Sequence, residues 1–222
     1  MLLDLFFPRR CLGCGAWGNY FCRDCQQEIK TIKLQICPIC QKPALQGQTH
    51  PVCQTPYSLD GLTSIFTFEG VIKEAIGKLK YWLITDLIEE LVALSVDQMP
   101  RKLTRSLILV PIPLHPRRQR WRGFNQAELL AKILGKQFNW QISTDYLIRS
   151  KATQPQIKLK SKERKINVQK AFKLNPKARA KVRNKKLIVF DDVWTTGSTL
   201  RQAAQVLKRA QAQEVWGLTL AR

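Results

Sequence analysis

Two adjacent acids followed by a cluster of hydroxyl side chains carry the clearest chemistry in this sequence. Asp191 and Asp192 end an apolar run of strand length, and a helical pattern opens a few residues later. The residues between are rich in hydroxyls: Thr195, Thr196, Gly197, Ser198 and Thr199. Backbone N–H groups in a glycine-containing turn at a helix N-terminus, surrounded by hydroxyls, form a concavity that suits a phosphomonoester. Carboxylates at the end of the strand suit the vicinal hydroxyls of a ribose.

The same stretch has a simpler interpretation as a strand, an Asp-initiated turn and a Ser or Thr helix cap. Two acids, four hydroxyls and a glycine within nine residues are more than capping needs. Neither the Walker pattern with its lysine nor the dinucleotide-binding glycine pattern fits. The sequence therefore predicts a phosphosugar site.

A second group of residues has metal-ligand spacing. All seven cysteines lie before residue 54, and an odd number with C-x-x-C spacing favours metal over disulfides. His50 lies three residues before the last cysteine, Cys53, so the segment offers eight metal ligands. Sequential pairing gives Cys11, Cys14, Cys22 and Cys25 for one Zn²⁺, and Cys37, Cys40, His50 and Cys53 for a second. Spacing alone leaves a cross-braced pairing open, and it leaves open a loop histidine that binds nothing.

The predicted zinc sites are structural. Four protein ligands close a tetrahedral shell, so no position stays open for catalysis. The segment has short loops and few large apolar residues, and metal contributes roughly 10–16 kcal/mol of apparent binding energy to such modules. We therefore expect two structural Zn²⁺ ions.

An arginine-rich segment follows a second apolar strand, which ends in prolines near residue 111. Four guanidinium groups fall within six residues: Arg117, Arg118, Arg120 and Arg122. Guanidinium forks match phosphate oxygens better than ammonium groups do, so this segment predicts a basic, anion-binding loop. Asn125 is predicted to cap the following helix, and His115 to be a loop residue rather than a catalyst.

Composition limits the class of protein. A chain of 222 residues with 45% hydrophobic residues holds one core plus a small module. Its net charge is +21, and residues 149–186 carry fifteen basic residues and one acid. This balance favours a polyanion, although a solvated lysine-rich face is the simpler alternative. Prolines interrupt the longest apolar run, no transmembrane helix fits, and we expect a cytoplasmic protein.

The remaining pattern predicts elements around these sites. Residues 66–96 read as a strand end followed by a long amphipathic helix region. Residues 214–221 form the closing strand, with Trp216 in the core. Trp121, Phe124 and Trp140 lie among basic residues and predict stacking surfaces for a single-stranded nucleic acid.

Residues 191–199 resemble the phosphoribosyl pyrophosphate (PRPP) motif of type I phosphoribosyltransferases. The whole chain resembles the ComF family, the ComFC and GntX type proteins with an N-terminal double zinc ribbon. This resemblance implies an α/β type I phosphoribosyltransferase fold, a mainly parallel sheet flanked by helices, over residues 59–222. It implies a small double zinc ribbon over residues 1–58.

The resemblance also implies roles for individual residues. Asp191 and Asp192 would hold the ribose as the catalytic acids, and the hydroxyl-rich turn would hold the 5-phosphate. Arg122 and Gly123 would bind the pyrophosphate with its Mg²⁺. Lys80 and Tyr81 resemble a basic-aromatic pair over the site, whereas the following Trp82-Leu83 departs from the family pattern. A lid or DNA-contacting segment would use Arg149, Lys151, Gln156, Lys158 and Arg164.

Two functions follow from the resemblance. The first is a PRPP-binding phosphoribosyltransferase with an undefined acceptor, which takes part in natural transformation by handling incoming single-stranded DNA. Its implied partners are a ComFA-like helicase and recombination mediators at the inner face of the membrane. The alternative is a catalytically silent DNA-binding adaptor that senses PRPP.

Overall fold

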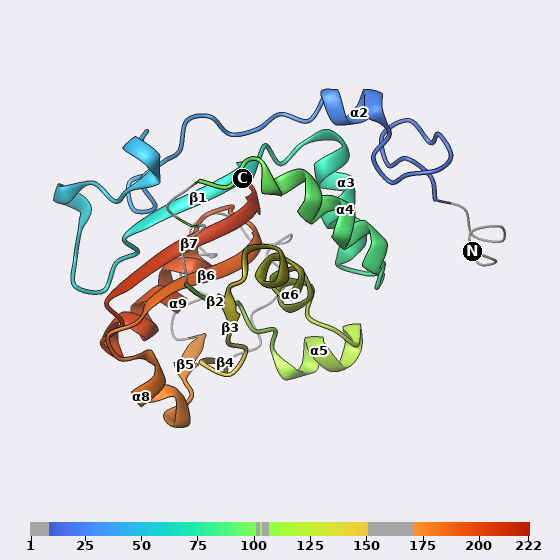
Figure 1. Ribbon diagram of the computed structural model, residues 1–222. Helices are drawn as coiled ribbons and strands as arrows, with labels where there is room; N and C mark the ends of the chain where they lie inside the picture. The colour runs from blue at the N-terminus through green and yellow to red at the C-terminus, as the bar shows by residue number, and fades with distance from the viewer. Residues whose placement is uncertain (1–8, 101–102, 104–106, 151–170) are drawn as a thin grey trace.

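A five-stranded sheet forms the centre of the molecule. The computed structural model describes residues 9–100, 103, 107–150 and 171–222. Within these residues the strand order is β1-β7-β6-β2-β3, and each pairing is parallel (Figure 1). The strands are β1 (Gly61–Phe66), β2 (Ile108–Pro111), β3 (Gln141–Ile142), β6 (Lys186–Val193) and β7 (Glu214–Ala221). The predicted α/β class with a mainly parallel sheet is confirmed, as is the closing strand over residues 214–221.

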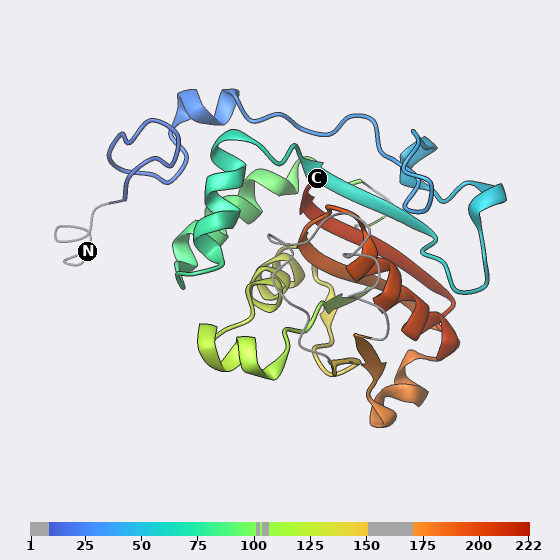
Figure 2. The ribbon, with the colours of Figure 1, turned by 180° about the vertical axis from the view of Figure 1, so that it is seen from behind.

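Helices cover both faces of this sheet, which is why its strands are apolar runs rather than alternating ones. Helices α4 and α6 contact each other, and α6 packs on β2 and β6. Helix α9 packs on β6 and β7 from the other side, as the two views together make clear (Figures 1 and 2). The helices that flank the sheet are α3 (Gly70–Leu79), α4 (Thr85–Val96), α6 (Gln126–Phe138) and α9 (Ser198–Arg209).

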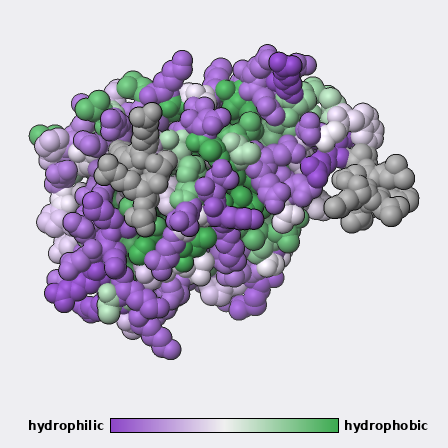
Figure 3. All heavy atoms as spheres, in the orientation of Figure 1, coloured by the Kyte–Doolittle hydropathy of each residue, from purple (hydrophilic) through white to green (hydrophobic). Residues whose placement is uncertain are grey.

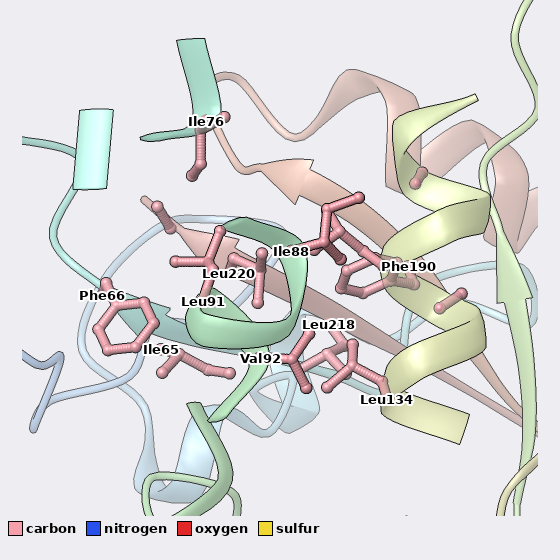
Figure 4. Packing of buried hydrophobic residues seen from close by; sticks show 14 of the residues in the cluster. Ile65, Phe66, Ile76, Ile88, Leu91, Val92, Leu134, Phe190, Leu218 and Leu220 are labelled. Atoms are coloured by element: carbon pink, nitrogen blue, oxygen red, sulfur yellow. The ribbon is translucent and has the colours of Figure 1, made fainter. Parts of the chain in front are cut away.

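Two apolar clusters, one on each face, hold these layers together. The first joins α3, α4 and α6 to the sheet, and Figure 4 shows Ile88 of α4 beside Phe190 of β6. The second cluster lies under α9. Each fully buried Leu, Ile or Phe contributes about 1.5–3 kcal/mol relative to an exposed one, so these clusters hold the helices on the sheet. Trp216 is buried, as predicted, and its indole N–H donates to Thr63.

A small antiparallel unit and a short helix lie beside α9. Strands β4 (Leu147–Arg149) and β5 (Phe172–Leu174) pair in register, with Arg149 opposite Phe172. The chain continues through η5 (Pro176–Ala178) and α8 (Arg179–Val182) into β6. This unit places Arg149 near the carboxyl end of β6.

The cysteine-rich segment runs along the outer edge of β1 (Figure 1). It contains α2 (Arg23–Gln27), η1 (Leu45–Gly47) and η2 (Pro51–Cys53). The Gln35 side chain bonds both the N–H and the C=O of Ser64, and the Thr49 N–H donates to the Asp60 carbonyl. Because these bonds use the free edge of β1, the segment is fastened to the sheet and covers that edge.

Two sequence-based expectations for helices need correction. The helix region predicted within residues 66–96 is two helices, α3 and α4, separated by a break. A continuous helix would bury Leu83 beside Leu79 and Leu87, but Leu83 is 58% exposed. The arginine-rich loop is a short helix, α5 (Pro116–Arg122). His115 caps α5 by accepting from the Arg117 N–H, and proline occupies the first turn, which are the usual signals that start a helix.

Candidate functional site

The hydroxyl-rich turn joins the end of β6 to the start of α9. Gly197 stands at the helix N-cap with φ 72°, a left-handed conformation that favours glycine. A Cβ there would lie 2.1 Å from Cζ2 of Trp194, whose ring is buried under the turn. Backbone conformation and close packing therefore both require glycine at this position.

The hydroxyls of this turn bond each other and one backbone donor. The Thr196 and Ser198 hydroxyls lie 2.7 Å apart, and the Thr196 hydroxyl accepts from the Ser198 N–H at 3.5 Å. One hydroxyl therefore meets the first turn of α9, as a helix cap would. The other first-turn N–H groups, next to several hydroxyls, form the kind of concavity that binds an anion.

The two acids lie at the carboxyl end of β6, next to this turn. Asp192 is buried, and its Oδ1 accepts from the Val193 N–H at 2.9 Å. Its Oδ2 accepts from Gln126 Nε2 at 3.4 Å and lies 3.7 Å from Lys80 Nζ. Burial and the neighbouring charge of Asp192 raise the pKa of Asp191 well above its ordinary value, while Arg149 opposes this shift. A pair of adjacent carboxylates thus lies next to the turn.

Three arginines surround these carboxylates. Arg122 donates to Gln126 Oε1, so it reaches Asp192 through Gln126. Burial lowers the pKa of Arg122 and of Arg149. The negative charge of Asp192 opposes this shift for Arg122, and the negative charge of Asp191 opposes it for Arg149. The positive charge of Arg118 lowers both pKa values further. A cluster of guanidinium groups next to acids binds a dianion readily, because the anion relieves the repulsion among the arginines.

An aromatic pair stands beside Arg122. Tyr81 comes from the break between α3 and α4, and Trp121 from α5; their ring centroids are 6.4 Å apart at 89°. Tyr81 is 59% exposed and Trp121 73% exposed, and the Arg122 guanidinium lies 6.0 Å from the Tyr81 ring. We call Tyr81 and Trp121 the aromatic pair. The stacking role predicted for Trp140 is wrong, because Trp140 is buried and stacks on Phe138.

The cysteine-rich segment gathers its ligands into two clusters in sequential order. The ligand atoms within each cluster lie within 4.8 Å of one another. Three or four thiolates with at most one imidazole, arranged in this way, fit tetrahedral Zn²⁺. The clusters are Cys11, Cys14, Cys22 and Cys25, and then Cys37, Cys40, His50 and Cys53.

His50 belongs to the second cluster and is not a loop histidine without a role. Its Nδ1 lies 3.3 Å from Cys40 Sγ, and its Nε2 lies 3.0 Å from the Pro43 carbonyl. A metal on Nδ1 leaves the proton on Nε2, where it donates to that carbonyl. This second contact orients the ring toward the cluster.

The predicted site residues divide into those that meet and those outside the described part of the chain. The structure brings Asp191, Asp192, Arg122 and Arg149 together beside the turn. Gly123 ends α5 in a left-handed conformation with open space around it. The predicted lid residues outside the described ranges are Lys151, Gln156, Lys158 and Arg164.

Sequence reasoning did not single out two residues that the structure places in the site. Asn125 caps α6 as predicted, because its side chain accepts from the Ala127 N–H. Gln126, the next residue, bridges Arg122 to Asp192. Arg201 donates to the Thr196 carbonyl from the first turn of α9. A helical-wheel reading of α9 from Gly197 puts Arg201 one turn away, on the side of the loop.

Fold and site together define the class of protein. Residues 122–222 match the family described as phosphoribosyl transferase domain, and residues 2–55 match the double zinc ribbon domain. The chain is thus a double zinc ribbon joined to a phosphoribosyltransferase domain.

Sequence similarity to known proteins identifies the family to which the chain belongs within this class. The chain is 32% identical to the DNA utilization protein YhgH of Escherichia coli K12 over 93% of this chain and 92% of that one. It is 30% identical to the competence protein ComFC of Bacillus subtilis, over 90% and 83%, and 29% identical to the competence protein F of Haemophilus influenzae, over 97% and 99%. The chain belongs to the ComF family, as the sequence motifs predicted.

The chain also resembles a solved structure described as the allosteric regulatory enzyme of purine biosynthesis, at 17% identity and a TM-score of 0.35. That match covers 85% of this chain and 31% of the other, and the family assignment does not depend on it. Within the described residues, no helix combines the length and apolarity needed to cross a membrane.

Proposed function

We propose that this protein binds PRPP at the carboxyl end of β6 and transfers its 5-phosphoribosyl group. The turn of residues 195–199 holds the 5-phosphate through backbone N–H groups and hydroxyls. Asp191 and Asp192 accept hydrogen bonds from the ribose hydroxyls. The observation that carries this proposal is the joint placement of the hydroxyl-rich turn, the two carboxylates and the arginine cluster.

In this proposal Arg122 and Gly123 bind the pyrophosphate, with Arg118 beside them. Guanidinium forks bind its oxygens, and the left-handed backbone at Gly123 leaves space for close approach. Hard oxygen ligands suit Mg²⁺, which when bound neutralises part of the pyrophosphate charge. Catalysis is electrostatic: the arginines stabilise the leaving pyrophosphate while Asp191 and Asp192 hold the ribose, on which positive charge develops. No covalent nucleophile is required.

Calorimetric titration of PRPP with Mg²⁺ tests this assignment. Asp191→Asn and Asp192→Asn each remove a charged acceptor, and we expect each to weaken binding by about 1.5–3 kcal/mol. Asp97→Asn, on an exposed residue at the end of α4, is the matched control and leaves the affinity unchanged. Equal affinity in all four proteins would refute the site.

Turnover is a separate question from binding. Incubation with PRPP, Mg²⁺ and candidate acceptors, with detection of released pyrophosphate, tests for transfer. Release that depends on an acceptor and is lost in Asp192→Asn supports an enzyme. Binding of PRPP without release supports the alternative, a silent adaptor that senses PRPP.

The second candidate function is binding of single-stranded DNA, and the aromatic pair favours it. Exposed Tyr81 and Trp121 beside arginines offer stacking surfaces within a cationic region, which is how proteins hold single strands without reading sequence. The relatives named for DNA utilization and competence support the same role. A ComFA-like helicase and recombination mediators remain the partners that this proposal includes.

A further inference from the structure

The side chain of Gln126 lies between a positive and a negative charge of the candidate site. Its Oε1 accepts a hydrogen bond from Arg122 Nη1, and its Nε2 donates to Asp192 Oδ2 at 3.4 Å. Gln126 and Asp192 are each only 7% exposed. A neutral amide therefore connects the two charged side chains where little water reaches them.

The two charged groups do not pair with each other directly. In the part of the chain that the structure describes, Asp192 forms its ion pair with Lys80, whose Nζ lies 3.7 Å from Oδ2, and no ion pair joins Asp192 to Arg122. Opposite charges attract more strongly where water is excluded, so a guanidinium and a carboxylate with nothing between them would close on each other. The amide of Gln126 occupies the place where they would meet.

Only an amide satisfies both neighbours at once. A guanidinium has donors and no acceptor, and a carboxylate has acceptors and no donor. A glutamate at position 126 would offer no donor to Asp192, and a lysine would offer no acceptor to Arg122. The residue type thus matches the two charges that it separates.

This arrangement leaves both charged groups able to bind a ligand. Asp192 accepts one hydrogen bond at Oδ2, from Gln126, and one at Oδ1, from the Val193 N–H, whereas a carboxylate offers about four acceptor positions. Arg122 gives one donor to Gln126, and a guanidinium has about five. A bidentate pair between Arg122 and Asp192 would use both oxygens and two donors on one another.

The backbone at the start of α6 determines where Gln126 lies. The Asn125 side chain accepts from the Ala127 N–H, and its Nδ2 donates to the Ile112 carbonyl at 3.0 Å, one residue beyond β2. Helix α6 also packs on β2 and β6. Because none of these contacts uses the Gln126 side chain, its removal leaves the start of the helix in place.

We propose that Gln126 is a positioning residue, a neutral spacer that prevents Arg122 and Asp192 from pairing with each other. The spacer keeps Asp192 available to the ribose hydroxyls and Arg122 available to the pyrophosphate. The inference rests on the proposed function, because it requires that Asp192 binds the sugar. It assigns Gln126 no contact with the ligand.

The first test is calorimetric titration with ribose 5-phosphate, which has the sugar and the 5-phosphate but no pyrophosphate. Gln126→Ala removes the spacer, and we expect the direct pair that forms to weaken binding about tenfold. Adding Arg122→Gln to Gln126→Ala removes the group that occupies Asp192, so the affinity should return toward that of the parent. Adding Arg209→Gln instead, at an exposed position of α9, removes the same charge and should restore nothing.

Restoration by a second substitution distinguishes a spacer from a merely structural residue. If Gln126 only maintained the fold, the loss of another side chain could not repair the damage, and the double variant would bind no better than Gln126→Ala. Alanine has the highest helix propensity, which favours an intact α6 in both variants.

The second test uses PRPP with Mg²⁺, which engages both charged groups. Arg122→Gln should weaken PRPP binding less in the Gln126→Ala background than in the parent, because Arg122 is already paired with Asp192 there. Such a departure from additivity is expected for residues in one hydrogen-bond network. Equal losses in the two backgrounds would overturn the spacer.

The outcomes separate this proposal from the proposed function. If the parent binds neither ribose 5-phosphate nor PRPP, the proposed function itself fails. If the parent binds ribose 5-phosphate and Gln126→Ala binds it equally well, the spacer role is overturned. Weak binding in Gln126→Ala that Arg122→Gln does not improve overturns it as well.

Discussion

Asp191 holds its proton more tightly than an ordinary aspartic acid. Burial and the adjacent Asp192 carboxylate raise its pKa, while the hydrogen bond from the Asp192 N–H and the charge of Arg149 act in the opposite direction. The folded state therefore binds a proton that the unfolded state has already released, in the pH range between the ordinary and the raised pKa. Stability must fall as pH rises through this range, because the folded state binds more protons there. Two carboxylates placed side by side in this way reduce the stability of the folded protein at higher pH.

Asp191→Asn should flatten this pH dependence. Without the carboxyl, the free energy of unfolding should decline less than in the parent as pH rises above the ordinary pKa of an aspartic acid, since the excess proton uptake of the folded state is gone. Urea unfolding at several pH values measures the difference. Asp97→Asn is the control and should keep the slope of the parent. Parallel curves for the parent and Asp191→Asn would contradict the raised pKa.

At the scale of elements, one carboxylate attaches the first zinc ribbon to the transferase domain. Glu90 of α4 accepts from the N–H groups of Tyr20 and Phe21 at 3.0 and 3.2 Å, and it pairs with Arg9. The Phe21 side chain is buried in the cluster that includes α4. Backbone donors and a ring thus dock on the same helix, and the metal maintains the fold of the docked loop.

Glu90→Ala should loosen this attachment. Two partly buried N–H groups lose their acceptor, which costs roughly 1–3 kcal/mol. Amide hydrogen exchange at Tyr20 and Phe21 should quicken accordingly, while exchange in β6 stays as in the parent. Glu89→Ala, an exposed neighbour on the same helix, is the control. Unchanged protection at Phe21 in Glu90→Ala would mean that the ribbon is held by its apolar contacts alone.

The elements differ in how far their sequences determine them. Strands β6 and β7 were predictable because fully buried parallel strands read as continuous apolar runs. The helix α5 was overlooked because its arginines suggested a loop, although Pro116 and Gly123 are start and stop signals. The break before α4 was not predictable from local periodicity, because α4 packs against α6, which is distant in the sequence.

The residues of the candidate site also differ in how far the sequence predicts them. Asp191, Asp192 and the turn are contiguous, so spacing alone revealed them. Gln126 comes from α6 and Arg149 from β4, and only the folded chain brings them beside the turn and Arg201 of α9. The boundary between residues 58 and 59 stays a prediction. The zinc ligands were predictable as a set because each pair is local.

For the whole molecule, charge and exposed aromatic surface determine which partners fit. The net charge is +21, and polar side chains cover much of the face shown in Figure 3, most clearly around α8. Long-range attraction of a polyanion needs only this excess of positive charge, and it depends strongly on salt. Stacking on exposed rings is local and depends weakly on salt. The two contributions can therefore be separated in one titration series.

Binding of an oligonucleotide without secondary structure, measured by fluorescence anisotropy at increasing salt, makes this separation. The logarithm of the association constant should fall linearly with the logarithm of salt concentration. Trp121→Ala should weaken binding by about 1–3 kcal/mol at every salt concentration and leave the slope unchanged, since it removes a stacking surface and no charge. Trp17→Ala, at a ring 62% exposed on the first ribbon, is the control and should bind as the parent does. Asp191→Asn should also leave DNA affinity unchanged if the strand lies on the aromatic pair rather than in the sugar site. Equal affinities for the parent and Trp121→Ala would show that the aromatic pair does not bind the DNA. An association constant that does not change with salt would show that attraction between the phosphates and the cationic protein does not contribute to binding.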